Sequence, residues 1–370
     1  MAESAGTGIP RRSVTGASGP AARTPPRRPR SVRRTTTHDS LRPDGPGGPV
    51  TLVAQGRDLR TAADGTAAVV ATARVDAVAS TPGNVLQALA ADPADDRLRA
   101  LIGRRASSGF RRAVDELLPG EAGLGTIRYQ LLDDMPTALL VSGYAVLARW
   151  HAVGEHPLPS GPAAGVLPAG ALQQADMCSG WARDGVMMTG MAAGVPPYFE
   201  GPAVADVAGS EDSQGNGPAG GAVQADANGW HAHGRLPPGG MRRRRRIDVW
   251  LDADPDGTPV ARVESFFRDS YAPWDGPAGT ERVVHEYSVR AVVATETESF
   301  RSCTADFGAL PWPECPGATA SAGRLAGTPV AGLRRRVREE FLGVGTCTHL
   351  NDTLRALADV GPLAAIAGRD

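Results

Sequence analysis

The clearest secondary-structure pattern in the chain is RIDVWLDADPDGTPVARVESFF, residues 246–267. Apolar and polar residues alternate over residues 246–251 and again over 260–267, and residues 254–257 between them have the composition of a tight turn. A period of two places alternate side chains on one face of a β-strand. The stretch therefore predicts two antiparallel strands joined by a hairpin, and residues 283–297 predict a third strand.

Helical patterns follow these strands. Residues 318–326, 333–341 and 348–360 carry apolar side chains at helical spacing, and in the last of them Leu350, Leu354 and Leu357 share a face. The C-terminal half of the chain thus predicts a small antiparallel sheet followed by packed helices.

The N-terminal half follows a similar order. Residues 49–78 alternate around a turn at Asp64 and Gly65, which predicts strand, turn and strand. Residues 85–102 and 109–118 have helical periodicity. The run 137–150 is interpreted as a strand or a short buried element, and its apolar part, residues 138–147, is too short to cross a membrane.

Short motifs recur in the same order in both halves. The matches are LIG at 101–103 with LAG at 325–327, GFRRAV at 109–114 with GLRRRV at 332–337, and GT at 125–126 with GT at 345–346. Ordered self-similarity is the usual sign of repeated structural units. We therefore expect an α+β protein made of two tandem related halves, each a small antiparallel sheet followed by packed helices.

Composition divides the chain into four parts. We expect residues 1–30 to be a disordered Arg/Pro-rich tail, and residues 31–150 to be the N-terminal half, acting as a scaffold. Residues 151–240 are a Gly/Ala/Pro-rich connector with a candidate binding loop at 176–181. Residues 241–370 form the C-terminal half.

Charge and residue usage exclude several classes of function. The chain has no lysine, so its 39 basic residues are all arginine, and Schiff-base chemistry and a Walker A lysine are excluded. A net charge of -1 argues against nucleic acid or a membrane as a partner of the whole protein. The four cysteines lie in a long chain without a signal-peptide pattern, so we expect reduced thiols in the cytoplasm.

Five consecutive arginines, Arg242 to Arg246, precede the first strand of the C-terminal half. Such a run can bind phosphate or nucleic acid. Because it continues into a strand, we favour a solvated strand edge that hinders aggregation.

The densest group of reactive residues is GTCTHLND at 345–352. Cys347 lies where a loop enters the last predicted helix, and the dipole of a helix N-terminus favours thiolate. His349 is two residues away, and Asp352 shares a helix face with it. In the N-terminal half the corresponding residues are Ile127, Arg128 and Tyr129, so the reactive side chains are present in one copy only.

Three interpretations of this group stay open. Cys347 and His349 could join Cys315 and His285 in a metal site, for which zinc or iron is the suitable ion. Cys347 could be a nucleophile with a histidine base, and Asp352 beside them. In the third interpretation, Cys347 packs as a small apolar residue and His349 only satisfies the loop.

These residues resemble a known bacterial family. The segment 345–350, following Cys315 and the LAG motif, is similar to the C-terminal signature of the domain of unknown function 2889 (DUF2889), and residues 245–248, 267–270 and 285–287 fit the same pattern. The resemblance implies a polar centre at Cys315, Cys347, His349 and His285 but no particular activity. In this sequence Thr346 stands where the family pattern more often has glycine.

We expect an intracellular protein that acts as an enzyme on a small organic molecule, with a Cys/His-centred site that holds a divalent metal ion. The alternative is a non-catalytic binding or assembly protein. Metal content of the untagged protein distinguishes these two hypotheses.

Overall fold

The structure is a computed structural model of the 370-residue chain. It describes residues 16–18, 24–153, 174–194, 197–204, 229–277 and 280–369. About two-thirds of the predicted tail at 1–30 and about half of the connector at 151–240 fall outside these residues.

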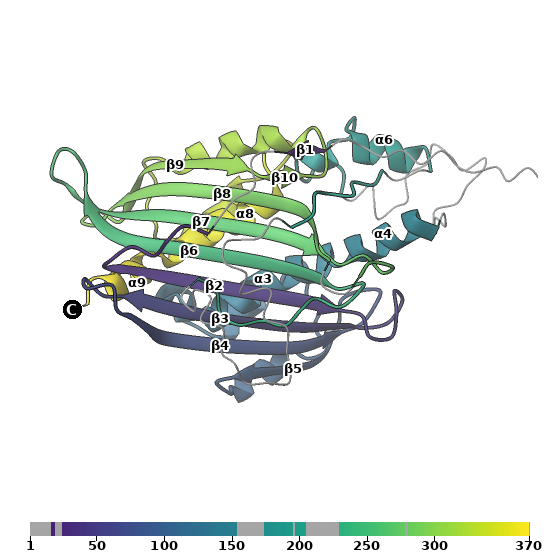
Figure 1. Cartoon of the computed structure of the whole chain (residues 1–370), viewed down its shortest axis with the longest axis horizontal. Helices are drawn as coiled ribbons and strands as arrows, with labels where there is room; N and C mark the ends of the chain where they lie inside the picture. Colours follow the sequence, from purple (N-terminus) through teal and green to yellow (C-terminus); the bar gives the residue numbers. More distant parts are fainter. Residues whose placement is uncertain are drawn as a thin grey trace, which may run out of the picture.

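One eight-stranded antiparallel sheet runs through the molecule, with the strand order β5-β4-β3-β2-β6-β7-β8-β9 (Figure 1). Its strands are β2 (Ser31–Leu41), β3 (Val50–Thr61), β4 (Ala67–Ala79), β5 (Leu86–Asp92), β6 (Met241–Ala253), β7 (Pro259–Tyr271), β8 (Arg282–Ala294) and β9 (Ser299–Phe307). Two short strands, β1 (Ala17–Ser18) and β10 (Ala309–Leu310), form a separate pair. Each half of the chain contributes four consecutive strands, and the halves meet where β2 pairs with β6.

Helices follow the strands in each half. The N-terminal half has η1 (Asp96–Leu101), α1 (Phe110–Leu117), α2 (Glu121–Leu124), α3 (Ile127–Val141) and α4 (Gly143–Val153). The C-terminal half has η4 (Cys315–Leu325), α7 (Leu333–Glu340), α8 (Thr348–Ala356), η5 (Leu357–Asp359) and α9 (Val360–Ala367). Between the halves lie η2 (Ser179–Trp181) and α6 (Val186–Ala192).

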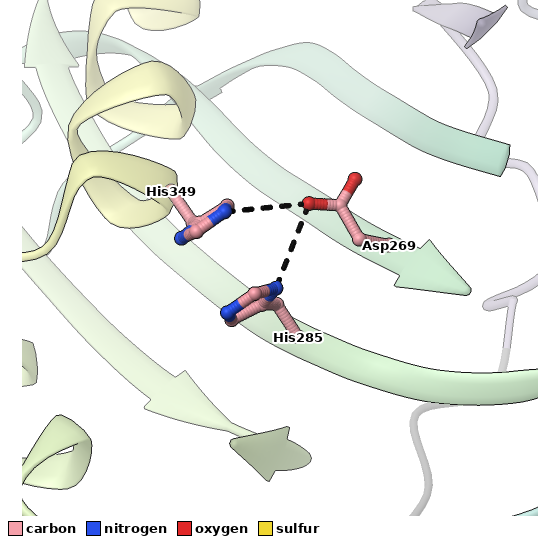
Figure 2. A group of neighbouring side chains, drawn as sticks. All are labelled: Asp269, His285 and His349. Atoms are coloured by element: carbon pink, nitrogen blue, oxygen red, sulfur yellow. Dashed lines mark ion pairs between the residues drawn. The ribbon is translucent and has the colours of Figure 1, made fainter. Parts of the chain in front are cut away.

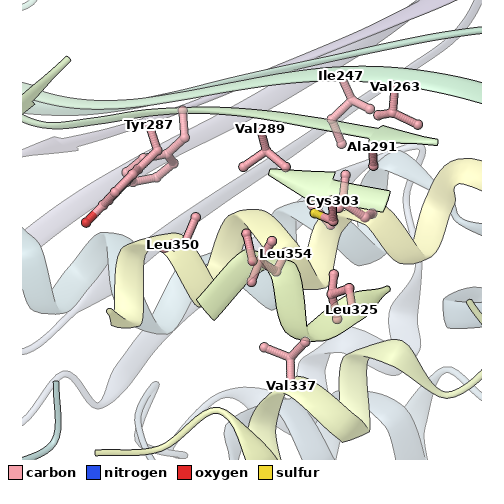
Figure 3. Packing of buried hydrophobic residues seen from close by; sticks show 14 of the residues in the cluster. Ile247, Val263, Tyr287, Val289, Ala291, Cys303, Leu325, Val337, Leu350 and Leu354 are labelled. Carbon is pink, nitrogen blue, oxygen red and sulfur yellow. The ribbon is translucent and has the colours of Figure 1, made fainter. Parts of the chain in front are cut away.

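The longer helices cover one face of the sheet, and each half has its own hydrophobic core. In the C-terminal half, Ile247, Val263 and Val289 on the strands pack towards Leu350 and Leu354 of α8 (Figure 3). A second cluster joins β3, β4 and β5 to α1 and α3. The predicted α+β class is confirmed. The two halves do not each form a sheet of their own, because their strands join in one sheet.

The prediction for Arg242 to Arg246 is wrong. These arginines lie in β6, which pairs with β2 on one side and β7 on the other, and all five are buried. Because side chains alternate along a strand, Arg243 and Arg245 face the helices and the other three face the opposite side of the sheet. Each of the five forms an ion pair with a carboxylate, most of them from other segments and one, Asp248, from β6 itself, so the run forms no exposed basic patch.

The face of the sheet opposite the helices is crossed by the last part of the connector, which includes residues 230–234. His231 lies between the hydroxyls of Thr35 and Thr37, 2.8 and 3.0 Å from its two ring nitrogens. Arg242 donates to the Gly234 carbonyl at 2.6 Å and to both oxygens of Asp39. The WHAH segment, residues 230–233, thus docks on the protein's own sheet.

Most strand and turn predictions are confirmed, and two segments differ. The apolar run 137–150 is helical, in α3 and α4, because an apolar run alone does not distinguish a buried strand from a buried helix. Residues 85–102 form β5 and η1 rather than one helix. The helical stretch Ile127–Val153 is long and apolar enough to cross a membrane, but 72% of its apolar 18-residue window is buried inside the protein, as expected for a core helix.

Candidate functional site

Two neighbouring strands and one helix place three polar side chains together. Asp269 lies near the end of β7, directly opposite His285 on β8, and the pairing shifts register just after Asp269. Such bulges re-aim side chains and are frequent beside functional sites. His349 lies in the first turn of α8, where Cys347 is the N-cap residue.

The three side chains converge on one carboxylate oxygen (Figure 2). Asp269 Oδ2 lies 3.6 Å from His349 Nε2 and 3.7 Å from His285 Nδ1. The two imidazole rings stack, with centroids 3.6 Å apart and planes inclined by 19°. One ligating atom from each residue lies within 4.8 Å of the others. Among the described residues this is the one cluster of at least three such groups with metal-site dimensions.

Arg243 holds the carboxylate in place. Its Nε and Nη2 donate to the two oxygens of Asp269 at 2.9 and 3.0 Å, and its Nη1 donates to Asp352 at 2.8 Å. A carboxylate offers about four lone-pair positions, so Asp269 Oδ2 keeps one towards the imidazoles. Arg243 therefore orients Asp269 and balances its charge.

Both histidines are neutral in the folded protein. Burial, together with the nearby Arg243 guanidinium, lowers the pKa of His349 to about 3. Burial and the neighbouring His349 ring lower the pKa of His285 well below its usual value. Nδ1 of His285 is buried and has no hydrogen-bond partner among the described residues. Neutral imidazoles have free lone pairs, which is the form that ligates metal ions.

The two histidines line a pocket of about 210 Å³. Its walls come from α4, from the loops around η2 and α6, and from the segment after β10. No arginine, aspartate or glutamate is among its lining residues. The large side chains of this wall are Tyr144, Leu147, Met177, Trp181, Met187 and Trp312. The pocket therefore combines apolar and aromatic walls with two imidazoles as its polar end, as small-molecule sites commonly do.

Cys347 lies behind His349 rather than in the pocket wall. Its Sγ is 3.7 Å from His349 Nδ1, and the residue is only 3% exposed. Its N-cap position matches the expectation, but burial raises the pKa of the thiol. A helix dipole contributes about 0.3–1 kcal/mol, whereas burying a charge costs several times more. The thiol is therefore protonated, contrary to the expected thiolate.

The other predicted site residues lie around this centre. Cys315 packs beside Gly180, close to Trp312, and burial raises the pKa of its thiol. Asp352 forms ion pairs with Arg243 and with Arg355, whose nitrogen is 2.7 Å from Asp352. The structure thus brings His285, His349 and Cys347 together.

Sequence reasoning missed Asp269. The available signal was a carboxylate two residues after Phe267, which places Asp269 on the buried face of a predicted strand.

Fold and site together define an α+β protein with a buried cluster of two histidines and one carboxylate beside an apolar pocket. Residues 241–361 match the model of a family described as protein of unknown function, DUF2889. The match confirms the resemblance over the segment that contains Asp269, His285 and His349. No curated protein and no solved structure matches the chain.

Proposed function

We propose that the protein binds a divalent transition-metal ion through Asp269, His285 and His349 and uses it to act on a small, largely apolar organic molecule. The observation that carries this proposal is the approach of three ligating atoms to within 4.8 Å of one another at the end of a pocket. The proposed ligand set replaces the thiols of Cys315 and Cys347 with the Asp269 carboxylate.

The donor set suits this chemistry. Two imidazoles and one carboxylate with open positions are the ligands of non-haem iron enzymes, and zinc accepts the same groups. Ligand distances of about 2.0–2.2 Å require the three side chains to close around the ion, which side-chain rotation provides. An ion there would act as a Lewis acid towards a molecule in the pocket, while the uncharged walls exclude water.

The lining of the pocket indicates the kind of molecule. Trp181, Trp312 and Tyr144 offer aromatic faces, and no lining side chain carries a permanent charge. A buried charge without a partner is costly, so an uncharged ligand is favoured. A volume of about 210 Å³ limits the ligand to a small molecule.

Metal content tests the proposal. We expect untagged protein, purified after growth with zinc and iron, to carry about one ion per chain. His285→Ala and His349→Ala should each lose it, because each removes one of three ligands. His233→Ala is the matched control, since it removes a histidine outside the cluster. Absence of any bound metal from folded wild-type protein supplied with both ions contradicts the proposal and favours the non-catalytic binding alternative.

The competing mechanism is nucleophilic attack by Cys347, with His349 as the base. It is supported by the chain of contacts from Cys347 Sγ to His349 at 3.7 Å and from His349 to Asp269 at 3.6 Å. Burial and the raised pKa of the thiol weigh against it. Cys347→Ser separates the two mechanisms: the metal proposal expects the ion to stay bound, whereas a nucleophile mechanism expects loss of turnover with no metal requirement.

We also propose that the two halves arose by duplication and that one copy kept the site. In the N-terminal half Arg34 pairs with Asp58 across β2 and β3, as Arg243 pairs with Asp269 across β6 and β7. The register shifts just after each of these aspartates, between Asp58 and Leu59 and between Asp269 and Ser270.

The duplicated copies differ at the reactive position. The residue opposite Asp58 is Ala71, where the C-terminal half has His285. Superposition of β2–β5 on β6–β9 is the test, and it should bring Arg34 and Asp58 onto Arg243 and Asp269. A superposition that separates these pairs contradicts the duplication.

We place the protein in the cytoplasm. All four cysteines are unpaired and buried, which fits a reducing compartment. Fractionation of the host cell tests this localisation, and recovery of the protein outside the cytoplasm contradicts it.

A further inference from the structure

A second and larger cavity lies on the helical side of the sheet, away from the histidines. It has a volume of about 1100 Å³ and is bounded by α1, α2 and α3 of one half and by α7 and α9 of the other. Cavities of about 300–1,000 Å³ bury a drug-sized ligand, so this one accommodates a larger molecule than the histidine pocket does. Sites between structural units are a common location for ligands.

The position of this cavity parallels that of the histidine pocket. Helix α9 of the C-terminal half lines it, whereas α4 of the N-terminal half lines the histidine pocket. The two helices lie at opposite ends of the sheet (Figure 1). Tyr129, in the first turn of α3, lines the larger cavity, as His349 in the first turn of α8 lines the smaller one. Two helices that line the larger cavity, α3 and α9, thus correspond in the repeat to α8 and α4 at the histidine pocket.

Much of the cavity wall is apolar and formed by small residues. Val293 and Ala294 of β8, together with Ala358, Pro362 and Ala364 near the C-terminus, contribute to it. Leu251, also in the wall, is 40% exposed. A surface of this kind favours an apolar ligand body, because its burial removes exposed hydrocarbon from water.

The polar part of the wall is mainly cationic. Arg334, Arg335 and Arg338 line the cavity from α7, against two acids, Asp115 and Glu298. Two of these arginines are already paired, Arg338 with Asp115 at 3.3 Å and Arg334 with Asp359 at 2.5 Å, and Asp115 also accepts from the Tyr129 hydroxyl.

Arg335 is the arginine most available to a ligand. Its side chain is 74% exposed, and its ion-pair partner Glu339 is 4.0 Å away. Guanidinium groups recognise carboxylates in a fork geometry.

We propose that this cavity binds an organic carboxylate with a large apolar body, its anionic group at Arg335 of α7 and its apolar body against β8 and α9. Charge complementarity selects the carboxylate, and the small side chains of α9 leave room for the body. The site is independent of the proposed metal centre.

Decanoate and decanol, measured by isothermal titration calorimetry with the full-length protein, test the proposal. We expect decanoate to bind in one-to-one stoichiometry and decanol to bind about tenfold more weakly or not at all. Arg335→Glu should weaken decanoate binding by about tenfold and leave the weak decanol binding unchanged.

A pair of glycine variants locates the binding. An added Cβ at Gly361 of α9 would approach no atom closer than 3.9 Å, and Gly361 lines the cavity, so Gly361→Leu directs a side chain into it. Gly323→Leu is the matched control, because Gly323 is exposed, has open space around it and lies outside the cavity. We expect Gly361→Leu to abolish decanoate binding and Gly323→Leu to preserve it, with both variants melting cooperatively.

Three outcomes overturn the proposal. They are equal affinity for decanol and decanoate, decanoate binding that survives Gly361→Leu, and absence of binding heat in the wild-type protein at several temperatures. Loss of the metal in the histidine variants leaves this test unaffected, because the two sites share no lining residue.

Discussion

Replacement of Asp58 by asparagine tests whether the buried arginines depend on their carboxylates. Asp58 accepts from Arg34 Nε and Nη2, each at 2.7 Å, and neither side chain is more than 3% exposed. Removing one partner of a buried ion pair costs about 3–5 kcal/mol. Because Arg34 keeps Asp359 at 2.9 Å, we expect the lower end of this range, about 3 kcal/mol.

The equivalent replacement in the C-terminal half gives a matched comparison. Arg243 keeps Asp352 at 2.8 Å, so Asp269→Asn should also cost about 3 kcal/mol in chelator-treated protein. With the metal ion present, Asp269→Asn should lose further stability, because binding to the folded state alone stabilises it. Asp58→Asn should show no such metal-dependent difference.

Urea unfolding at pH 7, followed by circular dichroism with and without chelator, measures both effects. A loss of about 3 kcal/mol is a large fraction of the usual 5–15 kcal/mol, so the midpoint should shift clearly. A loss below about 1 kcal/mol for Asp58→Asn, the value of an exposed pair, would refute the reasoning. The double variant Arg34→Met, Asp58→Leu should recover most of the loss, because it leaves no unpaired charge at the site of the removed pair.

Three further predictions follow from single side chains. Burial lowers the pKa of His38, so the folded protein keeps this ring neutral, whereas the unfolded chain binds a proton below about pH 6.5. The free energy of unfolding therefore decreases as the pH falls from about 7 to 5. His38→Gln should show a smaller decrease over this range in the same urea assay. The four buried cysteines should react with a thiol reagent only after unfolding, and rapid labelling of the native protein would contradict their burial. Gly56→Ala should lower the free energy of unfolding by about 1–3 kcal/mol, because the added Cβ would lie 2.6 Å from Ile127 Cγ2. An unchanged melting temperature would show that the neighbouring side chain moves away at little cost.

The sequence by itself determined much of the local structure. Alternation around residues 254–257 and 64–65 predicted two hairpins that the structure contains, β6–β7 and β3–β4. Helical spacing predicted α1, α7 and α8. These patterns are readable because they arise between residues a few positions apart, whose side chains share a face of one strand or helix. The same locality identified His349 and Cys347 as neighbours in the first turn of α8.

Which charged side chains are buried and paired depends on the tertiary structure. Arg243 becomes a buried, oriented group because Asp269 and Asp352, 26 and 109 positions away in the chain, reach it when the sheet and α8 assemble. No local pattern distinguishes such an arginine from a solvated one, since its burial is tolerable only once those carboxylates arrive. Likewise, Asp269 joins His285 and His349 through strand register and helix docking, which depend on the free energy of the whole assembly rather than on the spacing of nearby residues.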